Sequence, residues 1–234
     1  MSNLPYSPSR SGAIQTVSLS FFRFSRGIDR LWALTMMGAA RFMLPGVPGI
    51  GFWKLLGSGT GEGFTPIPNT GVYAILAVWP DAATARAQTK GAGVFRRYLA
   101  RASESWTLFL SPTSVRGQWA GDTPFEITTP VEKGPLAALT RASVRPRKAL
   151  KFWRRVPDIS AVIGADPNVA FKIGVGEVPL LHQVTRRDGP HARAIAAVRD
   201  GDWFREELYA RFRVIGERGT WGGTSPLEHI KEEQ

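Results

Sequence analysis

The alternation of hydrophobic and polar positions predicts four strands and two helices in the first half of the chain. β-Branched and aromatic runs over residues 16–24, 50–56, 71–79 and 106–110 predict the strands. Helical periodicity predicts a helix over 25–43 and another over 82–102, interrupted near Gly91 and Gly93. The order is strand-helix-strand-strand-helix-strand. In the first helix the residues at helical spacing are Ile28, Leu31, Trp32, Thr35, Met36, Ala39 and Phe42.

The second half repeats this order. Strands are predicted over residues 138–144, 169–173, 180–185 and 212–215. Helices are predicted over 147–163 and 190–199, with residues 203–209 extending or restarting the second one. Two sequence echoes support the repeat. The run Phe52-Trp53-Lys54 through Gly59 resembles Ala170-Phe171-Lys172 through Gly176, and Gly117-Gln118-Trp119 resembles Gly219-Thr220-Trp221.

Two such units predict an α+β fold of tandem ferredoxin-like modules. If the two sheets pack on each other, the modules form a fused dimeric α/β barrel with a ligand cavity between sheet and helices. Two ferredoxin-like domains joined without packing are the alternative. The predicted boundaries are a disordered tail (1–13), a first module (14–120), a linker (121–136), a second module (137–222) and a second tail (223–234).

Composition narrows the chemistry. The 234 residues include 30 Lys and Arg against 19 Asp and Glu, which gives a net charge of +11. The chain has no cysteine, and this excludes disulfides, Cys-ligated metals and a Cys nucleophile. No signal peptide or spanning segment is seen, so we expect a cytoplasmic or peripheral membrane protein. The basic clusters are dispersed without an RNA-recognition motif. They suit solvated helix faces, anionic lipid, an acidic electron donor or haem propionates, and single-strand nucleic-acid binding stays a less favoured alternative.

Histidines and a glycine run are the candidate functional features. His182 shares a predicted strand face with Leu180 and Val184, and His191 begins a predicted helix, so each is either a core or capping residue or an iron ligand. With Asp188 they could also form a non-haem iron site. His229 lies in the charged C-terminal segment. The run 57–63 fits no nucleotide motif; it predicts a hairpin loop or a close approach to a flat ligand.

Several motifs resemble one family. They are Ser18-Leu-Ser-Phe-Phe-Arg-Phe24, the glycine-rich segment 51–66, Val78-Trp-Pro-Asp81, the segment 166–174 and Gly189-Pro-His-Ala-Arg-Ala-Ile195. Together they are similar to the spheroidene monooxygenases, carotenoid oxygenases of purple photosynthetic bacteria, over residues 17–221.

The resemblance implies O2-dependent hydroxylation of an acyclic carotenoid at C-2, with a 2-keto group after a second round. It implies a b-type haem, electrons from reduced ferredoxin, contact with the anionic inner photosynthetic membrane, and no nucleic acid. It makes His191 the expected axial iron ligand, with His182 in reserve and Lys54, Trp53 and Lys172 near the cofactor. No catalytic residue is assigned, and a non-catalytic carotenoid- or haem-binding relative is the alternative.

The sequence departs from the family at one place. Family members continue the strand after Thr185 into a Trp-Pro-Asp-like turn and a helix start, whereas this chain passes to Arg186-Arg187-Asp188. Either a segment is absent from the sequence, or the protein has lost an edge strand and part of a helix. A real loss would expose a neighbouring strand and open the pocket beside His191, which puts activity in question.

Overall fold

The computed structural model describes residues 14–60, 67–127, 134–145, 147, 171–176, 181–184 and 204–227. This part of the chain does not include the helices predicted over 147–163 and from 190, except for residue 147 itself. It also does not include His191 and His229.

The first half has the predicted order of elements. It comprises β1 (Thr16–Arg23), α1 (Gly27–Met43), a 3-10 turn η1 (Leu44–Gly46), β2 (Trp53–Gly59), β3 (Pro68–Trp79), α2 (Ala82–Gly91), α3 (Gly93–Arg101) and β4 (Glu104–Gly117). The second predicted helix breaks into α2 and α3 at Ala92, between the two glycines. The Asp81 side chain caps α2 by accepting a hydrogen bond from the Thr84 amide at 2.7 Å.

The second half contains β5 (Leu136–Val144), β6 (Ile173–Gly176), β7 (Leu181–Val184) and β8 (Phe204–Gly219). The prediction of a helix over 203–209 is wrong from Phe204 onward, because these residues begin the long strand β8. Leu208, Ala210 and Phe212 alternate into the core, and β8 pairs with β4 on one side and β5 on the other. Tertiary pairing overrides the helix preference of the two glutamates in this segment.

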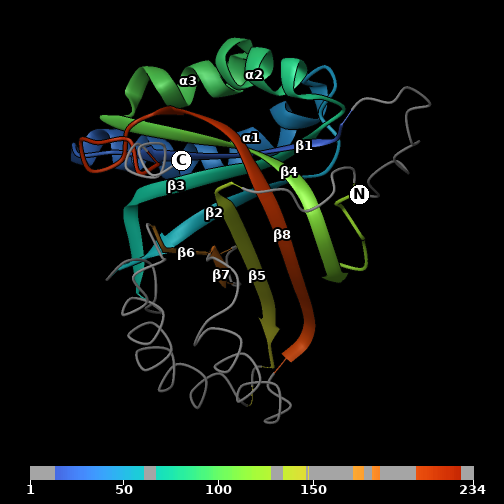
Figure 1. Ribbon diagram of the computed structural model, residues 1–234. Coiled ribbons are helices and arrows are strands. Elements are labelled where there is room, and N and C mark those ends of the chain that lie inside the picture. The colour runs from blue at the N-terminus through green and yellow to red at the C-terminus, as the bar shows by residue number, and fades with distance from the viewer. Residues whose placement is uncertain are drawn as a thin grey trace.

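All eight strands pair antiparallel in one curled sheet (Figure 1). Their order is β1-β3-β2-β6-β7-β5-β8-β4, and β4 returns to β1, so the ring closes. Each half contributes the same local order, β4-β1-β3-β2 and β8-β5-β7-β6. The two halves meet along β4 and β8 and, at the other junction, over two residue pairs of β2 and β6, Gly57 with Gly176 and Ser58 with Val175.

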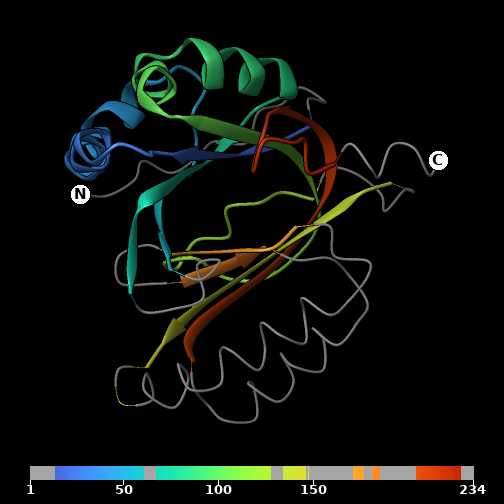
Figure 2. The same cartoon turned by 90° about the vertical axis from the view of Figure 1, so that its left-hand side faces the viewer.

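Two apolar cores lie on opposite faces of this sheet. Inward-facing residues such as Phe21, Trp106 and Leu208 fill the interior of the barrel. Outward-facing residues of the first half, among them Phe22 and Trp79, pack against α1, α2 and α3. These three helices lie together on one side of the sheet (Figure 2).

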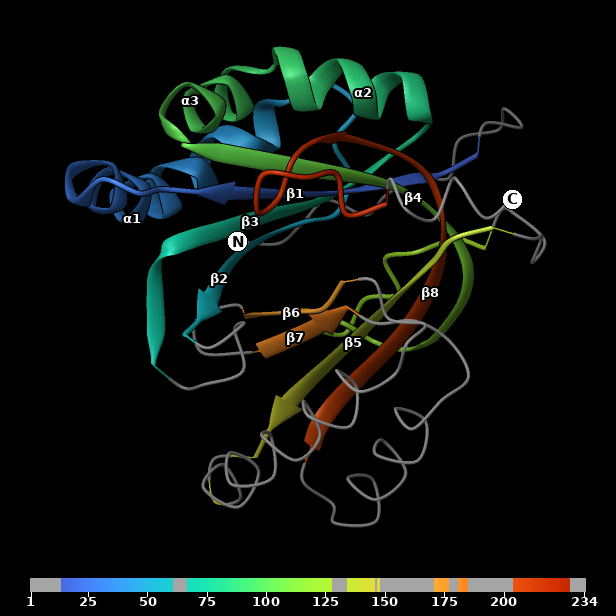
Figure 3. The same ribbon diagram turned by 60° about the vertical axis from the view of Figure 1, so that its left-hand side comes forward.

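The orientation of α1 differs from its apolar pattern. The predicted helix is present, but its buried residues are Asp29, Ala33, Met36 and Ala40. Ile28, Leu31 and Phe42 are exposed. The helix lies at an outer flank of the molecule (Figure 3). None of the described helices is long and apolar enough to cross a bilayer.

One expectation about an irregular segment needs correction. Gly57 and Gly59 belong to strand β2 and do not have positive φ angles, so the hairpin loop does not begin at Gly57. Strand β7, which ends just before the point where the family resemblance breaks off, pairs with both β5 and β6. The strand and helix start expected to be missing after Thr185 fall on residues 185–203, which lie outside the described residues.

Candidate active site in the barrel interior

Aromatic rings from several strands meet inside the barrel. Phe21 of β1 stacks on Trp106 of β4, with ring centroids 5.6 Å apart and an interplanar angle of 18°. Phe171 meets Trp106 edge-on at 4.8 Å, and Trp221 lies 5.7 Å from Phe21. Such contacts stabilise a core beyond the area they bury and leave few polar groups. This part of the interior is therefore a packed apolar cluster of flat rings.

One hydrogen bond fixes the orientation of Trp106. Its indole Nε1 donates to Glu217 Oε2 at 2.8 Å, and the Ser225 hydroxyl donates to the other oxygen of the same carboxylate. A buried indole N–H needs an acceptor, so Glu217 satisfies the one polar atom of this ring.

A second aromatic group carries two cations. Phe52 meets Trp119 edge-on with centroids 5.5 Å apart. Lys54 Nζ lies 4.8 Å from the Phe52 centroid and 5.8 Å from that of Trp119, and Arg141 Cζ lies 5.8 Å from Trp119 as well. Because Lys54 comes from β2 and Arg141 from β5, both halves of the barrel place a positive charge at the same ring.

Arg141 also pairs with Glu206, which binds the loop that follows β4. Glu206 accepts hydrogen bonds from the backbone amides of Ala120 at 2.9 Å and Gly121 at 2.8 Å. We call Arg141, Glu206 and this loop the first loop clamp. Partial burial acts to raise the pKa of Glu206, but the amides of Gly121 and Ala120 and the Arg141 charge together hold it below its ordinary value. The Arg141 side chain is only 3% exposed.

A second loop clamp matches the first, with the two halves in exchanged roles. Glu104 accepts from the Gly223 amide at 2.7 Å and pairs with Arg23 at 2.7 Å, whose guanidinium lies 4.3 Å from the Trp221 ring. Partial burial acts to raise the pKa of Glu104, but the Gly223 and Gly222 amides and the Arg23 charge hold it below its ordinary value. Arg23 differs from Arg141 in exposure, since its side chain is 38% exposed.

The backbone around the two clamps matches as well. Gly117 and Gly219 both have φ near +90°, and a Cβ at either would lie 2.1 Å from a carbonyl oxygen of the neighbouring strand. After each glycine, Trp119 pairs with Asp122 and Trp221 with Thr224 through a single bridge. The predicted echo of Gly117-Gln118-Trp119 in Gly219-Thr220-Trp221 is thus confirmed as a structural repeat.

The structure separates the residues expected near the cofactor. Lys54 lies on the interior side, at Phe52 and Trp119, whereas Trp53 packs on the helix side of the sheet. Lys172 lies just before β6, between Phe171 and Ile173, which both pack into the interior. The sequence match aligns Phe171 with Trp53, which packs on the helix side, so the two segments do not correspond residue for residue in the structure.

His182 has a defined position in the sheet. Its backbone is in register with Val175 of β6 and Arg141 of β5, which both belong to the interior side. Residue 182 is thus paired in register with an interior position on each side. His191 lies outside the described residues. Among the residues that the structure describes, no three His, Asp or Glu side chains gather as a metal site.

Sequence reasoning missed the charged residues of the two clamps. Arg141, Glu206, Arg23 and Glu104 stand in strands where a single charge is unremarkable, and their partners are distant in sequence. The usable signal was the repeated Gly-x-Trp motif, each followed by a turn that contains glycine and needs an acceptor for its amides.

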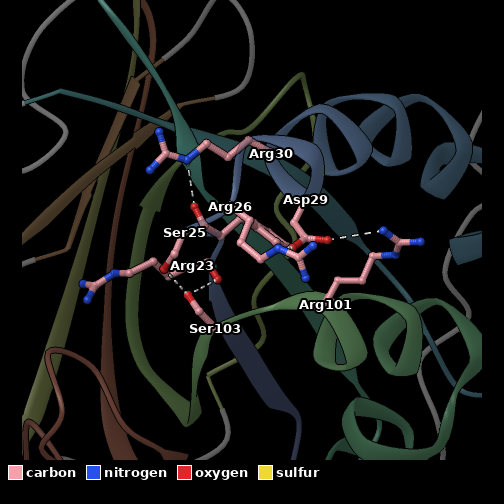
Figure 4. A network of polar contacts seen from close by, with 8 residues as sticks. Arg23, Ser25, Arg26, Asp29, Arg30, Arg101 and Ser103 are labelled. Carbon is pink, nitrogen blue, oxygen red and sulfur yellow. Dashed lines mark hydrogen bonds and ion pairs between the residues drawn. The ribbon is translucent and has the colours of Figure 1, made fainter.

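A separate polar cluster lies on the surface where α1 meets α3 (Figure 4). It borders a pocket of about 370 Å³ lined by Ser25, Arg26, Asp29, Ala100, Arg101 and Ser103. Asp29 in the first turn of α1 pairs with Arg101 in the last turn of α3 at 3.3 Å, and Ser25 contacts Ser103 at 2.8 Å. Each charge suits the helix end that carries it. This cluster fastens two helices together and lies away from the aromatic interior.

Comparison with known proteins identifies relatives along most of the chain. Spheroidene monooxygenase from Cereibacter sphaeroides is 47% identical over 230 residues, covering 92% of this chain and 71% of that protein. The enzyme of the same name from Rhodobacter capsulatus is 46% identical, with 90% and 94% covered, and that from Rubrivivax gelatinosus is 32% identical, with 83% and 80% covered. No protein-family model matches the chain.

Solved structures support the fold. An aldoxime dehydratase in complex with butyraldoxime is similar with a TM-score of 0.52 and 10% identity, covering 88% of this chain and 81% of that one. A second aldoxime dehydratase gives a TM-score of 0.51 and 11% identity, covering 86% and 82%. At these identities the likeness concerns the fold alone. The sequence identities carry the assignment: the chain belongs to the spheroidene monooxygenase family and is an oxidoreductase of the monooxygenase class.

Proposed function

We propose that this protein uses O2 to hydroxylate an acyclic carotenoid such as spheroidene at C-2, and that a second round gives the 2-keto product. The observation that carries the proposal is the identity of 47% and 46% to two spheroidene monooxygenases over nine-tenths of the chain. The aromatic interior around Phe21, Trp106 and Phe171 supports it, because a long apolar polyene needs a dry, apolar environment.

We further propose that the cofactor is a b-type haem held by histidine. The donor set fits: the chain has no cysteine, and residue 182 is in register with interior positions. Haem also carries two carboxylates, and the interior offers cations for them. Arg141 Nε is buried and has no hydrogen-bond partner among the described residues, and Lys54 lies at the same tryptophan. His191 is the proposed axial ligand, and His182 is the alternative.

Haem would activate O2, and the residues of the chain would bind and orient the substrate and exclude water. The aromatic rings exclude water from the reacting carbon and hold the polyene. Glu217 keeps the Trp106 ring in one orientation through its hydrogen bond. Lys54 and Arg141 neutralise anionic groups at the Trp119 end of the interior.

The fold supports a specific reading of the two halves. We interpret them as tandem ferredoxin-like modules fused into one barrel of the dimeric α/β type. The matching strand orders of the halves and the two loop clamps support this interpretation. Reduced ferredoxin is the proposed electron donor, and the protein is proposed to work in the cytoplasm against the anionic inner membrane, where its net charge of +11 favours acidic partners.

The test is spectroscopic and uses the full chain expressed with haem supply. The wild-type protein is expected to show a Soret band and, with spheroidene, reduced ferredoxin and O2, an oxygenated carotenoid in chromatography. His191→Ala should abolish the band, whereas His182→Ala and the matched control His229→Ala should keep it.

The outcomes separate the parts of the proposal. A wild-type protein without a Soret band after haem reconstitution would show that haem is the wrong cofactor. A band lost in His182→Ala and kept in His191→Ala would move the axial ligand to β7. A haem protein that yields no oxygenated product would contradict the proposed reaction.

A further inference from the structure

We propose that the outer face of α1 is the membrane-docking surface of this protein and that its partner is an anionic lipid bilayer. The inference deepens the proposed function, because it names the surface through which an enzyme acting on a membrane-dissolved carotenoid would approach its substrate. It rests on the exposure and charge of α1.

The first observation is an exposed apolar stripe. Ile28 and Leu31 are each 59% exposed and Phe42 is 81% exposed, although all three are large hydrophobic residues. With Leu34 they lie on one side of the helix, since positions three, four and seven apart share a face. The stripe runs from Ile28 in the first turn of α1 to Phe42 in the last, about 21 Å at 1.5 Å per residue.

The second observation is that the opposite side of α1 is also apolar. Ala33, Met36 and Ala40 are buried against the sheet, so the fold of the described residues uses that side and leaves the stripe uncovered. The neighbouring helices differ. The exposed positions of α2 and α3 are small or basic, among them Arg86, Lys90, Arg96 and Arg97. An uncovered stripe of four large apolar residues is a mark of an interaction surface.

The third observation is the charge at the border of the stripe, which decides the partner. Arg30 and Arg41 are exposed and, eleven residues apart, lie along one edge of the stripe. The single acidic residue of α1, Asp29, is buried and paired with Arg101. A helix with an apolar face, arginines beside it and no exposed acid has the composition of helices that lie in the plane of an anionic membrane surface.

The arrangement orients the molecule on the bilayer. Ile28, Leu31, Leu34 and Phe42 would enter the boundary between headgroups and acyl chains, and the two arginines would reach the lipid phosphates. Binding then depends on both apolar burial and charge. This combination distinguishes a membrane from a second copy of this basic chain, which would bring like charges together.

The experiment is flotation of the full-length protein with vesicles of phosphatidylglycerol and phosphatidylcholine, and with vesicles of phosphatidylcholine alone. The wild type should float with the anionic vesicles. Leu31→Gln and Phe42→Gln should each lower the partition coefficient by at least about tenfold, because each removes a large apolar side chain that would be buried in the bilayer. Arg41→Gln should lower it about fivefold on anionic vesicles alone.

The matched control is Ile127→Gln, since Ile127 is 61% exposed but lies outside α1. It should float as the wild type does. The proposal is overturned if the wild type floats with neither kind of vesicle, or if the α1 variants float as well as the wild type. It is also overturned if Ile127→Gln loses as much vesicle binding as the α1 variants. A concentration-dependent dimer that Phe42→Gln abolishes, without vesicle binding by the wild type, would assign the stripe to a second copy instead.

The readouts also separate this inference from the proposed function. The α1 variants should keep the wild-type haem spectrum and the wild-type turnover of detergent-solubilised carotenoid. Turnover in detergent without vesicle binding would remove the docking surface and leave the reaction intact. Vesicle binding without turnover of carotenoid, in vesicles or in detergent, would support the docking surface and contradict the proposed reaction.

Discussion

Replacing Glu206 by glutamine tests the energetic difference between the two loop clamps. Glu206 uses one carboxylate oxygen for the Gly121 amide and the other for the Ala120 amide and Arg141. Glutamine has one acceptor oxygen and turns an N–H₂ group toward the remaining donors. The variant therefore leaves at least one backbone amide without its acceptor, and it removes the countercharge of Arg141.

The magnitude follows from the burial of the arginine. With its side chain 3% exposed, Arg141 cannot be rehydrated when Glu206 loses its charge, and breaking a buried pair from one side destabilises by about 3–5 kcal/mol. Glu104→Gln makes the same chemical change in the second clamp. There Arg23 is 38% exposed, so its lost ion pair is worth only about 0–1 kcal/mol, beside about 1–3 kcal/mol for the hydrogen bonds.

The assay is denaturant unfolding at neutral pH, followed by tryptophan fluorescence because Trp119 and Trp221 sit in the clamps. Glu206→Gln should lose about 2 kcal/mol more than Glu104→Gln, a difference assigned to the buried guanidinium. Adding Arg141→Met to Glu206→Gln should recover part of that loss. Equal losses in the two single variants, or no recovery in the double variant, would refute the reasoning.

Two further predictions concern the same clamps. Ala120 has a φ angle of +56°, and the matching position of the second clamp is Gly222 at +72°. Ala120→Gly should therefore raise the melting temperature by about 1–3 °C, and Gly222→Ala should lower it by at least as much. A calorimetric experiment in which Ala120→Gly lowers the melting temperature, or Gly222→Ala raises it, would contradict the equivalence of the two positions. The pKa values of Glu206 and Glu104 are lowered in the folded state, so their stabilisation is complete above the ordinary glutamate pKa of about 4.3 and is lost as pH falls below it. Melting curves of the Glu104→Gln, Glu206→Gln double variant should therefore lose less stability between neutral pH and about pH 3 than those of the wild type, and parallel losses would contradict this linkage.

Local patterns were enough to predict most of the first half. The period-two alternation of β1 and the glycines around Ala92, which divide α2 from α3, act within a few residues, so they can be read without knowledge of the fold. The repeat of Gly117 and Gly219 was also visible, because the same strained turn requires glycine at both places.

What the sequence did not predict depends on contacts between distant residues. The segment that begins at Phe204 is a strand because β4 and β5 pair with it from both sides, which no local propensity records. The clamps join Glu206 to Ala120 across 86 residues and Glu104 to Gly223 across 119. Likewise, the period of α1 specified a helix, but its two apolar sides left open which one faces the sheet.

The clamps are reciprocal, and this has a consequence for how the protein holds together. A glutamate of the second half binds the loop of the first half, and a glutamate of the first half binds the loop of the second. In a chain that carried either half alone, each of these bonds would have to form between two molecules, and folding would depend on protein concentration. Joining β4 to β5 in one chain replaces that encounter by a fixed effective concentration. We therefore expect a single unfolding transition at all protein concentrations, with neither half unfolding before the other.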